Sequence, residues 1–318
     1  MPSLRGLKAI TDRVGLRMPQ LNLLVMLATK KLLGASFEDL PVNRDECARA
    51  NNNPLSACYT FGLLRIDSCA EMKSEIDFAI IGGTGLYAFD ELCDVAQHIE
   101  PNRYGTPSSA ITTGLWHNRR VVFLTRHGGD HTIAPHRVNY RANIQALKDL
   151  GVSRIVAVNA VGGIHQDMGP KAISICDQLI DYTHGRLSSF SDFAGEKVVH
   201  IDFTEPYSAS IRKALGVAAL KAKVPALEFG CYGCTEGPRL ETKAEIARMK
   251  RDGCDFVGMT GMPEAVLARE AGIEYGCIAV VANWAAGCGD QSEITMTEIF
   301  ANLAQGMADV KSILTELE

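Results

Sequence analysis

Short apolar runs that end in small, polar or basic residues recur along the chain from residue 77 onward. Five runs share this pattern: Phe78–Ile81, Val121–Leu124, Ile155–Val158, Phe256–Thr260 and Ile278–Asn283. A run that is apolar at consecutive positions suits a strand covered on both faces. The pattern therefore predicts buried β-strands whose last residues are chemically distinct from their cores.

Segments with helical spacing of apolar residues lie between several of these runs. They are Val138–Leu150, Thr242–Asp252, Pro263–Ala271 and a closing helix from about Met296 to Leu317. Strands that alternate with helices predict an α/β fold, a single domain with a central mixed, largely parallel sheet flanked by helices. Ligands of such sheets bind beyond the carboxyl ends of the strands, so the strand-end residues are the candidate site.

The first 71 residues follow a different pattern. They carry nine Lys/Arg against seven Asp/Glu and only four Gly, and the apolar run 21–28 is too short to span a bilayer. The basic start resembles an organellar transit peptide, although Ser is scarce. We expect residues 1–71 to be an N-terminal extension that is poorly ordered or not part of the working protein, whose start would be Met72. Residues 72–318 would then form the single catalytic domain.

Composition narrows the class of function. The 318 residues are 47% apolar and 22% charged, which excludes a chain disordered throughout. The net charge of −5 provides no excess of positive charge for binding nucleic acid or an anionic membrane. Ten cysteines show no disulfide framework, so we expect a reducing, cytoplasmic location. Cys231 and Cys234 have metal or redox spacing, but no second pair accompanies them, and we expect no metal. A small-molecule partner is favoured.

Two of the strand ends could hold an oxyanion such as phosphate. Gly82-Gly83-Thr84-Gly85 would offer unhindered N–H groups and a hydroxyl, and Arg126 and His127 add side-chain donors. Each motif alone could be a structural turn or a surface pair. In a body that carries a net charge of −7 after residue 71, we expect a locally basic pocket at Arg126 and His127.

A dinucleotide-binding oxidoreductase is an alternative suggested by the same glycines. Gly83 and Gly85 with Ala88 fit its fingerprint, but the segment Gln97–Glu100 leads into Pro101 and not to an acidic residue at a strand end. A nucleoside-binding protein without catalysis is a third possibility, which the complete set of phosphate residues disfavours.

Four longer motifs, in order along the chain, resemble the trimeric purine nucleoside phosphorylases, and most of all the branch that acts on methylthio-nucleosides. They are Ile80–Leu86, Arg126–Gly128 with Val138–Asn143, Glu236–Arg239, and Met259–Glu264. The resemblance covers about residues 76–317. It implies a homotrimer without metal or organic cofactor that uses inorganic phosphate to split a purine nucleoside into base and ribose 1-phosphate.

The resemblance also implies roles for individual residues. Phosphate would be bound by Thr84, Arg126, His127, Asn159, Ala160 and Thr260. Met259 would pack beneath the ribose, and Asn283, Trp284 and Ala285 would adjoin the purine. Asn159 stands where methylthioadenosine phosphorylases have Thr, so its side-chain contact with phosphate is an open point.

Residues expected at the purine favour a 6-oxopurine. Adenine-specific members carry two aspartates where this chain has Asn283-Trp284-Ala285, so the carboxylate that accepts from the adenine amine is missing. Asn283 can donate to a 6-oxo group, and Glu241 can accept from N1–H, where adenine has no proton. The alternative for Glu241 is a carboxylate that stabilises the start of a helix.

The expected sugar contact is apolar. Met296 aligns with the position where hydroxyl-specific phosphorylases have a His, and a soft thioether suits a methylthio group. Met296 could instead pack in the core at the start of the last helix. With Asn283 and Glu241 as catalytic residues, and Glu241 and Met296 setting specificity, the predicted reaction is phosphorolysis of 5′-methylthioinosine. The alternatives are inosine or guanosine, or methylthioadenosine.

Overall fold

The structure is a computed structural model that describes residues 76–86, 92–191, 198–290 and 295–318. The chain divides into two units, residues 1–71 and 72–318. The first unit lies outside the described residues, so the expectations for its order and its role stay predictions. All elements given below belong to the second unit.

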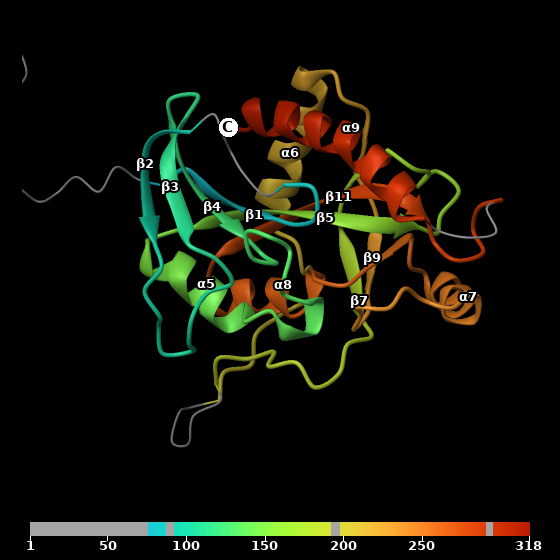
Figure 1. Ribbon diagram of the computed structural model, residues 1–318, viewed down its shortest axis with the longest axis horizontal. Helices are drawn as coiled ribbons and strands as arrows, with labels where there is room; N and C mark the ends of the chain where they lie inside the picture. Colours follow the sequence, from blue (N-terminus) through green and yellow to red (C-terminus); the bar gives the residue numbers. More distant parts are fainter. Residues whose placement is uncertain (1–75, 87–91, 192–197, 291–294) are drawn as a thin grey trace, which may run out of the picture. The chain divides into compact units, whose positions relative to one another are not determined.

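Eleven strands in the described residues form one sheet (Figure 1). They are β1 (Phe78–Gly82), β2 (Cys93–His98), β3 (Ile111–Trp116), β4 (Arg119–Thr125), β5 (Arg154–Gly163), β6 (Ile173–Ile175), β7 (Gln178–Asp181), β8 (Ala226–Leu227), β9 (Cys231–Cys234), β10 (Phe256–Gly258) and β11 (Glu274–Trp284). Parallel pairings join β1 to β4 and β5, β5 to β11, β9 to β7 and β10, and β6 to β8. The predicted mixed, largely parallel sheet is confirmed.

Strand β5 connects the two halves of the sheet. Its first half lies between β1 and β11, with Ile155 beside Ala79 and Tyr275 in register. Its last residues pair with β10 in the antiparallel sense, Gly163 opposite Phe256. The strand thus runs five residues past the predicted end at Val158, because small residues still find a partner on each side.

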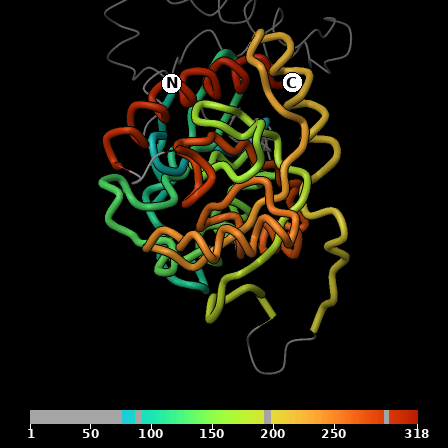
Figure 2. Tube along the Cα trace, turned by 90° about the vertical axis from the view of Figure 1, so that its right-hand side faces the viewer, coloured from blue at the N-terminus to red at the C-terminus, as the bar shows by residue number. Residues whose placement is uncertain are grey.

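Helices cover both faces of the sheet. They are α5 (Tyr140–Asp149), α6 (Ala209–Ala222), α7 (Lys243–Asp252), α8 (Gly261–Glu270) and α9 (Met296–Thr315), with a short 3-10 turn, η4, at Pro135–Arg137. Helices α6 and α9 lie on one face, and α5 and α8 on the other (Figure 1). In Figure 2, α7 (orange) lies at the end of the sheet that faces the viewer. The four predicted helices are confirmed, and α6 was not predicted.

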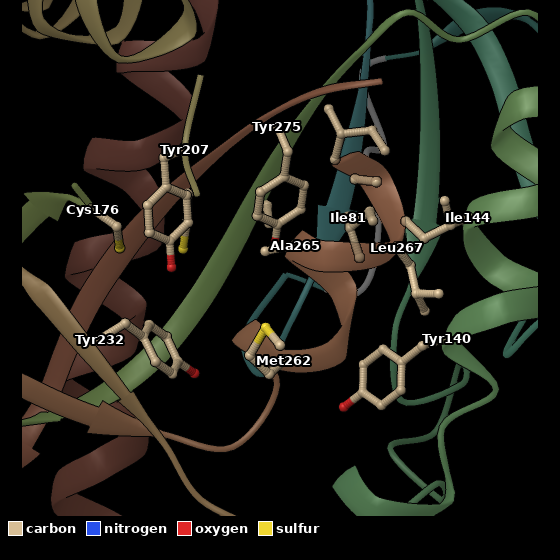
Figure 3. Packing of buried hydrophobic residues seen from close by; sticks show 14 of the residues in the cluster. Ile81, Tyr140, Ile144, Cys176, Tyr207, Tyr232, Met262, Ala265, Leu267 and Tyr275 are labelled. Carbon is tan, nitrogen blue, oxygen red and sulfur yellow. The ribbon is translucent and has the colours of Figure 1, made fainter. Parts of the chain in front are cut away.

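Alternate residues of the central strands pack into two separate cores. In β1, Phe78 and Ile80 join the cluster beneath α6 and α9, whereas Ala79 and Ile81 join the cluster beneath α5 and α8. Figure 3 shows Ile81 in that second cluster with Ile144 of α5 and Leu267 of α8. Burial on both faces explains why this strand is apolar at consecutive positions.

Local signals fix where two of the site-flanking helices begin. The Thr242 hydroxyl accepts from the N–H of Glu245, and the Glu245 carboxylate accepts from the N–H of Thr242, which makes a capping box for α7. Thr295 caps α9 by accepting from the N–H of Glu298 at 3.3 Å. Each cap sets the first turn of its helix beside a strand end.

Candidate active site

A cavity of about 380 Å³ lies where β1, β4, β5, β10 and β11 end. All the residues predicted to form the site line it, except Trp284: Thr84, Arg126, His127, Asn159, Ala160, Glu241, Met259, Thr260, Asn283, Ala285 and Met296. These residues come from segments up to 212 positions apart in the chain, between Thr84 and Met296. The strand ends that the sequence singled out therefore converge on one space.

The glycine turn after β1 allows an unusually close approach of main chain and side chain. A Cβ atom at Gly83 would stand 2.7 Å from the carbonyl oxygen of Val158 and 2.9 Å from Nη1 of Arg126. Only glycine fits between them. The turn closes with the N–H of Leu86 donating to the carbonyl of Gly83 at 3.1 Å, and it leaves Thr84 on the cavity wall.

Arg126 is 1% exposed and is held by a buried carboxylate, Glu264. Its Nε donates to Oε2 of Glu264 at 2.7 Å and its Nη2 to Oε1 at 2.8 Å. Burial alone would lower the pKa of Arg126, but the charge and hydrogen bonds of Glu264 raise it. The Tyr275 hydroxyl also donates to Glu264, at 2.8 Å. The guanidinium is therefore permanently charged and fixed in direction.

The roles of Glu264 and Tyr275 were missed by sequence reasoning. Glu264 belongs to the motif Met259–Glu264, but no function was assigned to it there. The available signal was physical: an arginine that points into a buried pocket needs a buried counter-ion. Glu264, which is 0% exposed, is that counter-ion.

His127 is neutral in this environment. Its Nδ1 donates to the carbonyl of Ile133 at 2.8 Å, since a carbonyl has no proton to give. Burial, and then the charge of Arg126, lower the pKa of His127 to about 4. The ring of His131 lies 4.5 Å away, centre to centre. Near neutral pH, Nε2 of His127 is therefore an acceptor and not a cation.

The expectation of a locally basic pocket is corrected by these two residues. The charge of Arg126 is balanced by Glu264, and His127 carries none near neutral pH. Among the described lining residues, Glu241 adds a further carboxylate. The pocket can recognise an anion through directed hydrogen bonds, but these side chains give it no net positive charge.

Asn159 links Arg126 to the rest of the wall. Its Oδ1 accepts from Nη2 of Arg126 at 3.0 Å, and its Nδ2 donates to the Tyr232 hydroxyl at 3.3 Å. The same hydroxyl accepts from the N–H of Thr260 at 3.3 Å. The Asn159 amide thus positions other site residues as well as lining the cavity. We call Arg126, His127, Asn159 and Thr260, each at most 6% exposed, the buried wall.

Glu241 lines the cavity and is not the carboxylate that caps a helix. The capping residue of α7 is Thr242, and its carboxylate partner is Glu245. Glu241 instead accepts from the Thr235 hydroxyl at 2.6 Å. Burial raises the pKa of Glu241, whereas the Thr235 hydrogen bond acts in the opposite direction. One carboxylate oxygen is therefore engaged, and the group remains beside the cavity.

The side chains of Asn283 and Trp284, at the end of β11, lie in different surroundings. Asn283 lines the cavity and its Nδ2 donates to the carbonyl of Trp284 at 2.7 Å. The Trp284 ring packs over Gly169, where an added Cβ would lie 3.1 Å from it. Asn283 and its neighbour Ala282 line the cavity, whereas Trp284 does not. Trp284 is thus not placed beside a purine by this geometry, whereas Ala285 lines the cavity.

Apolar side chains surround the mouth of the cavity. Met296 is the first residue of α9 and is 57% exposed, and Phe300, one turn later, is 52% exposed. Leu240 is 46% exposed. We call Leu240, Met296 and Phe300 the exposed rim. The exposure of Met296 argues against the alternative that it packs in the core.

Cys231 and Cys234 face different neighbours. Cys231 is hydrogen-bonded to Cys254, whereas Sγ of Cys234 accepts from the N–H of Met262 at 3.2 Å. No cluster of three metal-binding side chains occurs within the described ranges. In the same ranges, none of the helices has the length and apolar character needed to cross a membrane.

The described residues do not show the structural context of the dinucleotide alternative. That fingerprint requires the glycine turn to open a helix. After the turn at Gly83–Leu86, the next element in the described residues is strand β2, which pairs with β3 in the antiparallel sense.

The chain is similar to curated proteins along most of their length. It is 56% identical to a "Probable S-methyl-5'-thioinosine phosphorylase" of Xylella fastidiosa (strain 9a5c) over 229 residues, which is 72% of this chain and 97% of that protein. It is 43% identical to the "6-oxopurine nucleoside phosphorylase" of Pyrococcus furiosus, covering 74% of this chain and 89% of that protein.

A solved structure has the same fold. The methylthioadenosine phosphorylase from Schistosoma mansoni in complex with adenine superposes with a TM-score of 0.73 at 30% identity, covering 76% of this chain and 90% of that one. The family model of the phosphorylase superfamily matches residues 77–317. The chain belongs to the phosphorylase superfamily.

Proposed function

We propose that the protein cleaves 5′-methylthioinosine with inorganic phosphate, giving hypoxanthine and 5-methylthioribose 1-phosphate. One observation carries this proposal: a carboxylate, Glu241, and an amide, Asn283, line the same cavity as the buried wall, with Met296 at its mouth. The similarity to relatives named as S-methyl-5′-thioinosine phosphorylases supports it.

Phosphate would be held by Thr84, Arg126, His127, Asn159, Ala160 and Thr260, with Nε2 of the neutral His127 accepting from the P–OH group. A phosphate oxygen forms the new bond to C1′ as the C1′–N9 bond breaks, and the electron pair of that bond passes to the purine. The hydrogen phosphate loses one proton and the purine gains one, so the products are hypoxanthine and the sugar phosphate dianion. Arg126 keeps the phosphate below C1′, and no covalent nucleophile of the protein is needed. Met259 supports the ribose, and its neighbour Thr260 contacts phosphate.

Purine choice would rest on Asn283 and Glu241. The Asn283 amide donates to the 6-oxo group or accepts from N7–H, which stabilises the departing base. Glu241 accepts from N1–H of hypoxanthine, whereas the N1 of adenine has no proton to offer. A buried acceptor left facing another acceptor is strongly unfavourable, so the pair discriminates between the two bases.

A panel of four nucleosides tests the proposal: methylthioinosine, methylthioadenosine, inosine and adenosine, each with and without phosphate. We expect phosphate-dependent release of hypoxanthine, fastest from methylthioinosine. Equal turnover of methylthioadenosine would contradict the roles of Glu241 and Asn283, and preference for inosine would contradict that of Met296. If the protein bound a nucleoside but did not cleave it, the alternative of a nucleoside-binding protein without catalysis would hold.

The proposal also includes the oligomeric state, the cellular location and the cofactor requirement of the protein. A homotrimer in the cytoplasm, with no metal or organic cofactor, is expected from the resemblance. Exposed apolar side chains at Leu187, Val198 and Val199, 57 to 64% exposed, are compatible with burial between subunits. Light scattering of the purified protein measures the mass, and assays after dialysis against EDTA test independence from metal.

A further inference from the structure

Arg186 lies in the segment after β7 and is not among the residues that line the cavity. Its side chain is 4% exposed. Nε donates to Oε2 of Glu236 at 3.1 Å, Nη1 to the carbonyls of Met259 at 2.8 Å and Met262 at 2.6 Å, and Nη2 to the carbonyls of Thr235 at 3.2 Å and Glu236 at 2.8 Å. All five N–H bonds of the guanidinium are thus directed at the protein itself.

Four of these acceptors are main-chain carbonyls from two segments. Thr235 and Glu236 follow β9, and Met259 and Met262 follow β10, and the two strands are parallel neighbours. The planar guanidinium therefore joins the two chains where they leave the sheet. Arg186 also lies over the ring of Tyr140 of α5, at 5.7 Å (Figure 3 shows Tyr140 beside Met262).

The two segments carry the proposed contacts to purine and sugar, and Thr260, between Met259 and Met262, is also one of the proposed phosphate contacts. The Thr235 hydroxyl, on the residue whose carbonyl Arg186 binds, holds the Glu241 carboxylate at 2.6 Å. Met259 lines the cavity directly. By contrast, Arg126 is held by Glu264 and Asn159, and neither of these residues contacts Arg186 among the bonds described.

We propose that Arg186 is a positioning residue for purine discrimination: by fixing Thr235 and Met259 it keeps Glu241 aligned with the base. This inference rests on the proposed function. It predicts that weakening the guanidinium contacts changes the choice between 6-oxo and 6-amino purines more than it changes the use of phosphate. A residue that serves stability alone would lower all activities by the same factor.

The test is the substitution Arg186→Lys. Lysine keeps the positive charge, but its ammonium group cannot donate to the carbonyls of both segments at once as the planar guanidinium does. We expect kcat/KM for the 6-oxo nucleoside to fall about 10- to 100-fold. The ratio of kcat/KM for the 6-oxo over the 6-amino nucleoside should decrease, and KM for phosphate should rise by a smaller factor, since only Thr260 of the proposed phosphate contacts lies between residues that Arg186 holds. Arg248→Lys on α7 is the matched control, because Arg248 is an exposed residue paired with Asp252. A uniform loss of activity, or no loss, overturns the proposal.

If Arg186→Lys does not fold, a second variant provides the test. Thr235→Val removes the hydroxyl that holds Glu241 but retains the carbonyl that Arg186 binds. It should lower the ratio of kcat/KM for the 6-oxo nucleoside to that for the 6-amino nucleoside. An unchanged preference in this variant overturns the proposal.

Failure of the proposed function is distinguished by equilibrium binding. If the unmodified protein does not cleave nucleosides, the ratio of hypoxanthine to adenine affinity is compared between it and Arg186→Lys. An unchanged ratio overturns the role of Arg186 separately from the reaction.

Discussion

The buried wall and the exposed rim are built in opposite ways. Arg126 and Asn159 are each 1% exposed and every one of their contacts is shared with another buried group, whereas Met296 and Phe300 are more than half exposed. A wall residue cannot change without leaving a partner unsatisfied. A residue of the exposed rim can be substituted without leaving a buried partner unsatisfied. The proposed phosphate contacts thus lie in the core, together with the proposed purine contact of Asn283, whereas the proposed contact to the methylthio group, Met296, lies near solvent.

Arg126→Met should produce the largest effect, on all substrates equally. Activity should fall at least about 1,000-fold, because the phosphate loses the charge of the guanidinium and the Nη1 hydrogen that Glu264, Asn159 and Val158 leave available. The free energy of unfolding should fall by about 3–5 kcal/mol, because Glu264 is left buried without its counter-ion. Steady-state kinetics and urea unfolding measure the two effects.

The double variant Arg126→Met/Glu264→Met separates stability from chemistry. It should recover much of the lost free energy of unfolding, since no unpaired charge remains, without recovering activity. Return of activity in the double variant would show that Arg126 does not bind phosphate.

Glu241→Ala should act on one class of substrate only. Phosphorolysis of the 6-oxopurine nucleoside should fall roughly 10- to 1,000-fold, as expected for a charged hydrogen bond that strengthens in the transition state. The 6-amino nucleoside should lose little. Competition between the two nucleosides in one reaction measures the ratio, and a parallel loss on both would place Glu241 with the wall instead.

His127→Gln should alter how stability depends on pH. The unfolded chain binds a proton at His127 below about pH 6.5, whereas the folded protein does so only near pH 4. Stability from this residue is therefore lost as pH falls between these values, by roughly 1–3 kcal/mol.

The Gln variant has no such proton to bind, and its amide can still donate to the carbonyl of Ile133. The difference in unfolding free energy between variant and unmodified protein should shift in favour of the variant from pH 7 to pH 4.5. A constant difference across this range would mean that His127 titrates normally.

Met296→Ala should have the smallest effect. KM for the methylthio-nucleoside should rise about 3- to 10-fold through loss of apolar contact, with KM for phosphate unchanged. Because Met296 is exposed, the free energy of unfolding should change by less than about 0.5 kcal/mol. A matched Met259→Ala variant, next to Thr260 of the buried wall, should raise KM for all nucleosides. If Met296→Ala also raised KM for all nucleosides equally, Met296 would not select the methylthio group.

The parts of the fold that have a local cause could be predicted from the sequence. Runs apolar on both faces, such as Phe78–Ile81, mark central strands, and Thr242 with Glu245 marks the start of α7. Strand β2 was missed because its residues are largely exposed and give no apolar run. Helix α6 was missed as well.

The candidate site divides in the same way. Most of its lining residues sit in recognisable strand-end motifs, and Glu241 and Met296 were expected there from the family resemblance, so all but Trp284 could be placed on the cavity wall. The pairing of Arg126 with Glu264 joins positions 138 residues apart. A buried arginine calls for a buried counter-ion, but the local sequence does not say which carboxylate it is. The neutral state of His127 depends on burial and on the carbonyl of Ile133, which only the folded chain supplies.

The internal pairing of Arg126 has a consequence for turnover in different ionic environments. A pocket that attracts anions by net charge loses affinity as salt screens it, and it also retains an anionic product. Here the cation is already compensated by Glu264, which is 0% exposed and beyond the reach of dissolved ions. The affinity for phosphate should therefore vary little with ionic strength, and the sugar phosphate should leave without having to break a strong electrostatic hold.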